Sequence, residues 1–254
     1  MAQDMLKSFS RDPEGSDPAA RHSRSPSGSR LNNTATDWLS YLLYEGTYWL
    51  SAMSFVLGWS LRTDGMHNVP GRGPVLFISN HQSFLDPLLI GLAVRRHLHF
   101  LSRKSLFRFP VFAWLIRRLN AVPIDQEGSG IEGLKVTLRL LKEGRAMVVF
   151  PEGERTYDGA IHPLEAGVQL LIRRARAPIV PVAIAGAYEA WSRWRRLPIP
   201  APLFLPPAKG TLAVSVGKPL DTARLADLPR PDLLQALFVE LTQLHQHAER
   251  LRRK

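Results

Sequence analysis

Residues 74–87 read PVLFISNHQSFLDP, an apolar run that gives way to polar residues within one short segment. Turn-forming pairs precede the run, so 74–80 is typical of a buried strand. Asp86 and Pro87 suit the start of a helix, as an N-cap and a first helical residue, and the apolar residues up to 94 continue it. The stretch therefore predicts a strand, a polar loop and a helix.

The same alternation continues along the chain. Further strands are expected at 99–102, 121–124, 146–150, 178–184 and 211–219, and helices at 109–119, 130–143, 165–176 and 231–254. Strands that alternate with helices favour an α/β fold with a mostly parallel central sheet flanked by helices. The 254 residues, 45% of them hydrophobic, suffice for one domain with a sizeable core.

The N-terminal part departs from this pattern. Residues 1–37 are polar and rich in Ser, Arg, Pro and Gly, which predicts a disordered tail. Residues 38–62 are aromatic-rich, and up to residue 61 Glu45 is their only charge. We expect a membrane-associated helix there, or a helix pair divided at Gly46, because Trp and Tyr favour the membrane interface. An aromatic-rich core helix is the alternative. The folded domain then spans 63–254.

Charge and composition narrow the choice of partners. The formal net charge of +11 suits nucleic acid, an anionic membrane or a phosphate-bearing small molecule. The aromatic residues gather in apolar runs instead of alternating with Lys and Arg, which argues against nucleic acid. Residues 192–210 (SRWRRLPIPAPLFLPPAKG) combine arginines with apolar side chains. This segment either packs on the domain or enters a lipid interface.

The residue types present also limit the chemistry. The chain contains no cysteine, which excludes disulfides, thiolate metal sites and cysteine nucleophiles. His97 and His99 lack a carboxylate at ligand spacing, so no metal site is expected.

A first polar cluster, residues 80–86 (NHQSFLD), follows the strand expected at 74–80. In open α/β sheets, ligands bind at the carboxyl ends of the strands. His81 in such a place can act as a general base, and Asp86 across a turn can hold its other ring nitrogen and fix its tautomer. In the simpler interpretation, Asp86 only caps a helix and His81 is a polar loop residue.

A second polar cluster, residues 150–156 (FPEGERT), follows the strand expected at 146–150. Gly153 lets the backbone turn close to a ligand, and the planar donors of Arg155 suit a phosphate. Glu152 either anchors the turn by accepting backbone N–H groups or faces the substrate. The simpler interpretation is a turn with a surface ion pair.

In this order, the two clusters resemble the NHxxxxD and FPEGTR-like blocks of the PlsC-like lysophosphatidic-acid acyltransferases, a family of glycerophospholipid acyltransferases. Residues 103–110 (RKSLFRFP), 122–126 (VPIDQ) and 180–184 (VPVAI) resemble further blocks of that family. The resemblance covers residues 63–220, most of the expected folded domain.

The resemblance implies that His81 is the catalytic base and Asp86 its orienting carboxylate. The candidate substrate-binding residues are Glu152, Gly153, Arg155, Arg103 and Lys104. The implied reaction moves a fatty acyl group from acyl-CoA or acyl carrier protein to a lysophospholipid hydroxyl, with 1-acyl-sn-glycerol-3-phosphate as the first choice and phosphatidic acid as the product. No acyl-enzyme and no cofactor are needed, since the thioester is itself a substrate.

Two positions depart from the family pattern: Gln126 stands where the third block usually has Arg, and Glu154 where the FPEGTR block has Thr. The loss of a cation and the gain of an anion both weaken the case for an acceptor phosphate. Another acceptor, such as a lyso-aminolipid, and a catalytically inactive lipid-binding relative are therefore alternatives. We expect a membrane-associated enzyme with its active site on the cytoplasmic side.

Overall fold

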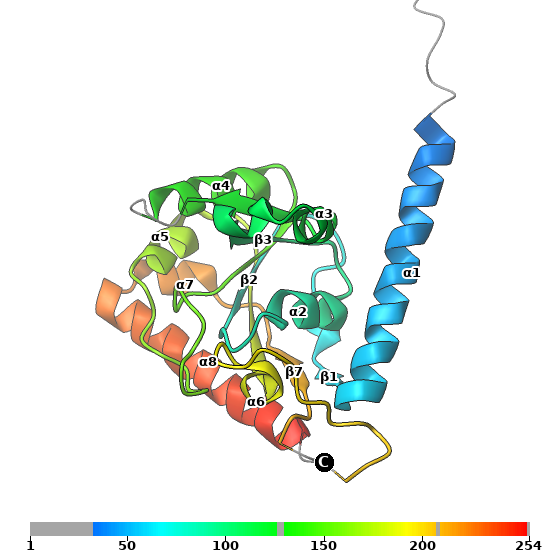
Figure 1. Cartoon of the computed structure of the whole chain (residues 1–254). Helices are drawn as coiled ribbons and strands as arrows, with labels where there is room; N and C mark the ends of the chain where they lie inside the picture. Colours follow the sequence, from blue (N-terminus) through cyan, green and yellow to red (C-terminus); the bar gives the residue numbers. More distant parts are fainter. Residues whose placement is uncertain (1–32, 126–129, 207–208, 253–254) are drawn as a thin grey trace, which may run out of the picture. The chain divides into compact units, whose positions relative to one another are not determined.

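The computed structural model describes residues 33–125, 130–206 and 209–252. At the centre of the fold lies a sheet with the strand order β1-β7-β6-β2-β5-β3-β4 (Figure 1). All neighbouring strands pair in parallel except β6 and β7, which are antiparallel. The strands are β1 (Arg62–Asp64), β2 (Val75–Ser79), β3 (Leu98–Arg103), β4 (Ala121–Ile124), β5 (Ala146–Val149), β6 (Ile179–Ala185) and β7 (Ala213–Val216). The expected α/β fold with a mostly parallel sheet is confirmed.

Helices connect most of these strands. They are α1 (Asn33–Trp59), α2 (Asp86–Val94), α3 (Pro110–Arg118), α4 (Ile131–Lys142), α5 (Gly167–Arg174), α6 (Ala187–Trp191), α7 (Thr222–Asp227) and α8 (Arg230–Arg252), with 3-10 turns η1 (Met66–Asn68) and η2 (Lys104–Arg108). The sequence pattern did not indicate β1, α6 or α7. Each contains only three to six residues, which is too short for a hydrophobic period to show.

The sheet is covered on both faces, because successive residues of a strand point to opposite sides. Val75 and Phe77 of β2 join a core cluster with residues of α2. Leu76 and Ile78 join a second cluster with residues of α4, α5 and α8. Burial on both faces explains why β2 is apolar without alternation.

The N-terminal helix differs from the expectation in its start and its continuity. α1 begins at Asn33, so residues 33–37 of the expected tail are helical, and it runs through Gly46 without a break. A glycine inside a helix costs only about 1 kcal/mol, which its neighbours can offset. The remainder of the expected tail, residues 1–32, lies outside the described residues.

The segment 45–59 of α1 packs with one side on the domain. Phe55 is buried in the core, and the hydroxyl of Tyr48 donates to the carbonyl of Leu92 at 3.1 Å. Trp49 and Leu50 are exposed. One side of this segment is therefore a core helix, the alternative drawn from the sequence, and the other side is exposed; its association with a membrane stays a prediction. Within the described ranges, no helix has both the length and the apolar character that crossing a membrane requires.

Candidate active site

The two polar clusters meet because the strands before them are neighbours. β2 pairs in parallel with both β5 and β6, so the loops after these strands leave the same edge of the sheet. Asn80 fixes the exit from β2: its Nδ2 donates to the carbonyl of Ile184 at 3.0 Å, and its Oδ1 accepts from the Ile184 N–H at 2.9 Å. The Thr156 N–H donates to the carbonyl of His81 at 2.8 Å, which joins the two loops directly.

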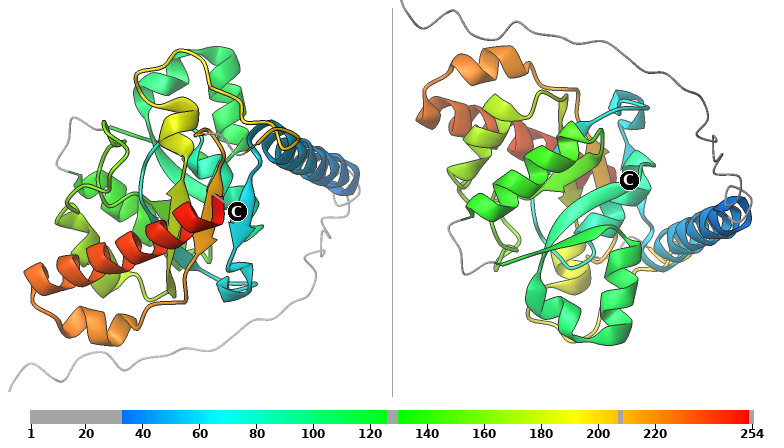
Figure 2. Two further views of the ribbon diagram at one scale, coloured as in Figure 1. Left: turned by 90° about the horizontal axis from the view of Figure 1, so that it is seen from below. Right: turned by 90° about the horizontal axis from the view of Figure 1, so that it is seen from above.

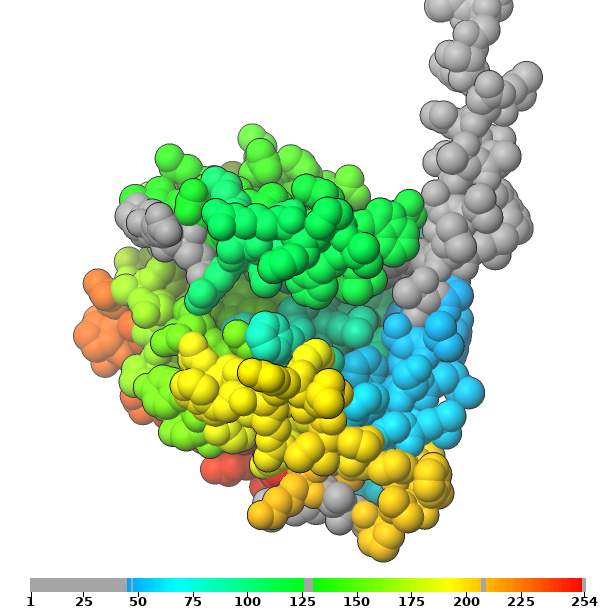
Figure 3. Space-filling view, in the orientation of Figure 1, coloured from blue at the N-terminus to red at the C-terminus, as the bar shows by residue number. Residues whose placement is uncertain are grey.

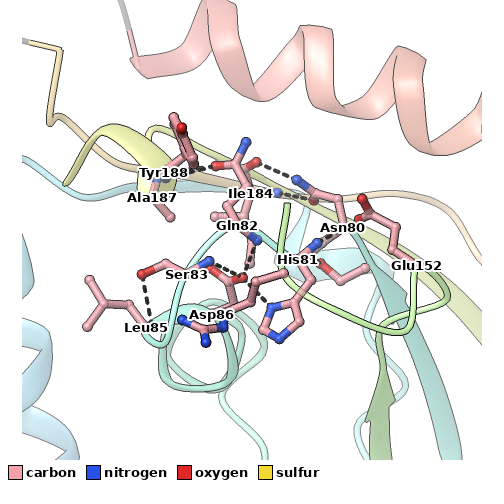
Figure 4. Close-up of polar contacts among 12 residues, drawn as sticks. Asn80, His81, Gln82, Ser83, Leu85, Asp86, Glu152, Ile184, Ala187 and Tyr188 are labelled. Carbon is pink, nitrogen blue, oxygen red and sulfur yellow. Dashed lines mark hydrogen bonds and ion pairs between the residues drawn. The ribbon is translucent and has the colours of Figure 1, made fainter. Parts of the chain in front are cut away.

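His81 and Asp86 contact each other within the first loop (Figure 4). Nδ1 of His81 lies 2.7 Å from Oδ2 of Asp86, whose side chain is fully buried. The His81 side chain is 19% exposed, and its ring stacks on Phe150 with 3.9 Å between the centroids. A carboxylate at this distance keeps the proton on Nδ1, which leaves Nε2 able to accept one.

The carboxylate of Asp86 serves the loop and does not cap the helix. α2 begins at Asp86 itself and has Leu85 at its N-cap, so the expected N-cap role of Asp86 is wrong. Oδ2 of Asp86 also accepts from the N–H groups of Gln82 at 2.5 Å and Ser83 at 2.8 Å. One carboxylate oxygen thus orders the loop backbone and orients the imidazole together.

Glu152 ties the second loop to the first. Its Oε1 accepts from the His81 N–H at 2.8 Å, and its Oε2 accepts from the His162 N–H at 2.9 Å. Only 7% of the residue is exposed. The structure therefore favours the anchoring role that the sequence left open, and not the substrate contact implied by the resemblance. Gly153 makes this turn with a φ of 78°, where a Cβ atom would lie 3.2 Å from Cγ of Glu165.

The Glu152→Gln variant tests this anchoring role. A glutamine has a single acceptor oxygen, so the N–H of His81 or that of His162 would face another donor. An unsatisfied buried group costs about 1–3 kcal/mol, so we expect kcat to fall by about ten- to a hundredfold. Steady-state turnover with saturating substrates measures this effect, and an unchanged kcat would exclude the anchoring role.

The same variant has an expected pH signature. Burial raises the pKa of Glu152 from 4.5 to about 7. Between these two values the folded protein holds the proton more tightly than the unfolded chain does, so stability falls as the pH rises. The free energy of unfolding of the wild type, minus that of Glu152→Gln, should therefore decrease from pH 4.5 to pH 7 and then level off. Chemical denaturation across this range measures the difference, and a constant value would contradict the assignment.

Arg155 is a partly buried cation beside the first loop. Its Cζ lies 3.5 Å from the centroid of the Phe84 ring. Burial lowers its pKa, and the positive charges of Arg193 and Arg103 lower it further. Its Nη1 atom is buried and has no hydrogen-bond partner among the described residues. A desolvated cation of this kind suits an anionic group of a ligand.

The other charged residues singled out from the sequence have different surroundings. Nζ of Lys104 lies 3.1 Å from Oδ2 of Asp125 on the surface, so this pair occupies the lysine. Oε2 of Glu154 lies 3.1 Å from Nη1 of Arg193, so the unusual anion is paired with another cation. Gln126, the second departure from the family pattern, lies outside the described residues.

Gln82 is a site residue that the sequence reasoning missed. Its Oε1 accepts from the Ala187 N–H at 3.2 Å. Its Nε2 donates to the carbonyl of Gly159 at 3.2 Å and lies 3.2 Å from Nε2 of His245 on α8. These contacts hold the first loop, residues 80–86, against α6 and the C-terminal helix. No local pattern could have shown them, because they join residues that are 77 to 163 positions apart.

No metal site accompanies these residues in the part of the chain that the structure describes. There, no group of three or more His, Cys, Asp or Glu side chains lies close enough to hold a metal ion. The site is thus a histidine–carboxylate pair beside a desolvated arginine. Such a site is suited to proton transfer on a substrate with an anionic group.

Comparison with known proteins places this geometry in a family. The family model for acyltransferases matches residues 60–185, a span that contains both polar clusters. The chain belongs to the acyltransferase family. This PlsC-like acyltransferase is 27% identical over 177 residues to the 1-acyl-sn-glycerol-3-phosphate acyltransferase of Bacillus subtilis (strain 168), a match that covers 69% of this chain and 81% of the relative.

Other relatives are named for the same activity. The PlsC-like acyltransferase is 32% identical over 125 residues to a chloroplastic 1-acyl-sn-glycerol-3-phosphate acyltransferase of Brassica napus. That match covers 48% of this chain but only 36% of the plant protein. The crystal structure of PlsC, the 1-acyl-sn-glycerophosphate acyltransferase of Thermotoga maritima, matches with a TM-score of 0.66 and 21% identity, over 89% of this chain and 85% of that one. At this identity the likeness supports the fold alone.

Proposed function

We propose that this acyltransferase moves a fatty acyl group from acyl-CoA or acyl carrier protein to the free hydroxyl of 1-acyl-sn-glycerol-3-phosphate, which forms phosphatidic acid. The contact between Nδ1 of His81 and the buried carboxylate of Asp86 is the observation that carries the proposal. The activities for which the relatives are named support this choice of acceptor. Because the acceptor is a lipid, the enzyme works at a membrane; the cytoplasmic side stays the prediction made from the sequence.

His81 acts as the base in this mechanism. Its Nε2 takes the hydroxyl proton while the hydroxyl oxygen attacks the carbonyl carbon of the thioester. The C–S bond then breaks, and the departing thiolate takes the proton back from the imidazolium. A C–O ester bond thereby replaces the C–S bond, and no acyl-enzyme forms. Asp86 stabilises the transient imidazolium with its negative charge.

Arg155, with Arg103 and Arg193 close enough to affect its pKa, supplies the binding site for the acceptor phosphate. The planar guanidinium offers two parallel donors to phosphate oxygens. Arg193 forms an ion pair with Glu154 and so compensates the negative charge of Glu154 beside this site.

The Arg155→Ala variant tests the phosphate site. A hydrogen bond to a charged group contributes about 1.5–3 kcal/mol, so the KM for 1-acylglycerol-3-phosphate should rise by about ten- to a hundredfold. With monoacylglycerol, which lacks the phosphate, the variant and the wild type should have the same KM. Equal losses with both acceptors would show that Arg155 supports the fold of the site instead of binding phosphate.

Thiol release from a long-chain acyl-CoA in detergent micelles tests the proposed function as a whole. We expect release to depend on added 1-acylglycerol-3-phosphate. Release that occurs only with another lyso-lipid, such as a lyso-aminolipid, would keep the chemistry and replace the acceptor. If none of the acceptors supports thiol release, either from acyl-CoA or from acyl carrier protein, the proposal is wrong.

A further inference from the structure

α3 has an unusual outer face. Two of its residues, Ala113 and Ile116, are buried against the domain. The outer side is apolar as well, whereas the outer side of a surface helix is normally polar. The exposed apolar side chains in and next to α3 are Phe109, Val111, Phe112, Trp114 and Leu115. Val111 is 83% exposed. A contiguous exposed apolar face on one helix indicates a contact that the isolated chain does not show.

The loop between α6 and β7 has the same character. Its exposed apolar side chains are Trp194, Leu197, Ile199, Leu203, Phe204 and Leu205. Its backbone is nevertheless held in place: the N–H of Ala201 donates to the carbonyl of Gly58 at 2.8 Å, and that of Leu203 to the carbonyl of Leu57 at 3.0 Å. The loop thus packs on the domain through its backbone while its apolar side chains face outward.

The exposed side chains of α3 and of this loop lie on one face of the molecule, and we call them the apolar rim. In Figure 3, the green α3 region and the yellow loop border a hollow in which the segment near residues 80–90 is visible. Both views of Figure 2 also place α3 and the loop on a common side. The rim therefore flanks the loop of residues 80–86, which we call the catalytic loop. Phe84 in that loop is itself half exposed.

Positive charge accompanies the apolar rim. Arg195 and Arg196 in the loop are exposed, as are Arg117 and Arg118 at the end of α3. The guanidinium of Arg118 lies 5.4 Å from the centroid of the Trp114 ring, so this cation lies directly beside an aromatic side chain of the rim. Apolar side chains beside arginines match a bilayer interface with anionic headgroups. The same charges would repel each other if two copies of the chain met through this face.

We infer that the apolar rim docks on an anionic lipid bilayer, so that the catalytic loop faces the membrane surface from which the lipid acceptor comes. The purpose of this docking rests on the proposed function, while the binding itself does not. The described segment 45–59 of α1 extends the same surface through Trp49, Leu50 and Met53, which are also exposed. Three separate segments thus surround the site, and docking does not depend on α1 alone.

Vesicle binding by the full chain tests this inference. The probes are vesicles of phosphatidylcholine alone and of phosphatidylcholine with phosphatidylglycerol, and flotation separates bound protein from free protein. The variant combines Val111→Ser with Phe204→Ser, one exposed position from each side of the rim. Its matched control combines Met66→Ser with Val239→Ser. Met66 and Val239 are exposed apolar residues on other elements. Neither variant touches the catalytic site.

We expect the wild type and the control to bind vesicles that contain phosphatidylglycerol. Burial of each large apolar side chain changes an equilibrium about tenfold, so the rim variant should bind at least about tenfold more weakly. Replacement of Arg195 and Arg196 with serine should weaken binding about fivefold for each charge, and only to the anionic vesicles. Equal binding by the rim variant and the control would overturn the inference.

Two further measurements separate docking from catalysis and from self-association. With water-soluble short-chain substrates, the rim variant should release thiol at the wild-type rate, because no membrane is involved. If vesicle binding is lost in the rim variant and the wild type shows no acyl transfer, docking stands and the proposed function fails. If light scattering shows a wild-type dimer that becomes monomeric in the rim variant, and no vesicle binding occurs, the face joins two copies and the inference is wrong.

Discussion

The His81→Ala variant is expected to lower kcat for acyl transfer by about 10²- to 10⁴-fold, the range in which a positioned general base contributes. Without the imidazole, the groups that contact Asp86 in the described part of the chain are backbone N–H donors, which cannot take the proton of the acceptor hydroxyl. The measurement is thiol release from acyl-CoA with saturating 1-acylglycerol-3-phosphate. Because binding does not require the proton transfer, KM for both substrates should change little.

The fold should tolerate this substitution. The bonds that tie the loops together use the backbone N–H and carbonyl of His81, and alanine keeps both. The loss of the stacking on Phe150 leaves only a small gap at a partly exposed position. A thermal melt should therefore show an almost unchanged midpoint. A variant that is folded and retains kcat within a few-fold of the wild type would show that His81 is not the base.

The Asp86→Asn variant is expected to have the second largest effect, a loss of kcat that reaches about 10⁴-fold at most. Its amide oxygen can still accept from the loop N–H groups, but the negative charge that stabilises the imidazolium is gone. If the amide turns so that its nitrogen takes the place of Oδ2, the loop N–H bonds are lost, the tautomer of His81 reverses, and the proton on Nε2 blocks the reaction. Thiol release under the same conditions measures the loss.

A matched control for Asp86→Asn is available in the same chain. Asp64 on the edge strand β1 also contacts a histidine, with its Oδ2 at 2.9 Å from Nε2 of His247 on α8, but this pair is exposed. Asp64→Asn should leave kcat unchanged. If both variants lose activity equally, the effect comes from a general loss of stability, and the role assigned to Asp86 is contradicted.

Much of the site could be predicted from sequence because it depends on local order. His81 lies two residues after the end of the buried strand β2, and Glu152 lies three residues after the end of β5. Parallel strands place their carboxyl ends at one edge of the sheet, so the expected mostly parallel sheet is consistent with two neighbouring loops there. The spacing from His81 to Asp86 likewise permits a turn that returns the carboxylate to the imidazole, as the 2.7 Å contact shows.

The remaining features depend on which segments the fold brings together. The choice between the two roles of Glu152 required the positions of the His81 and His162 N–H groups. The contact of Gln82 with His245 required the path of α8 across the sheet. The antiparallel β7 and the apolar outer face of α3 also had no local signal, because apolar residues are normally assigned to a core.

The measurement that most directly tests the central claim follows both products of one reaction. Acyl-CoA with an isotope-labelled acyl chain is mixed with 1-acylglycerol-3-phosphate, and mass spectrometry of the lipids is combined with a thiol assay. The wild type should form one labelled phosphatidic acid for each thiol released, and His81→Ala should form neither product at a comparable rate. Thiol release without labelled lipid, or equal lipid formation by His81→Ala, would contradict acyl transfer by the histidine–aspartate pair.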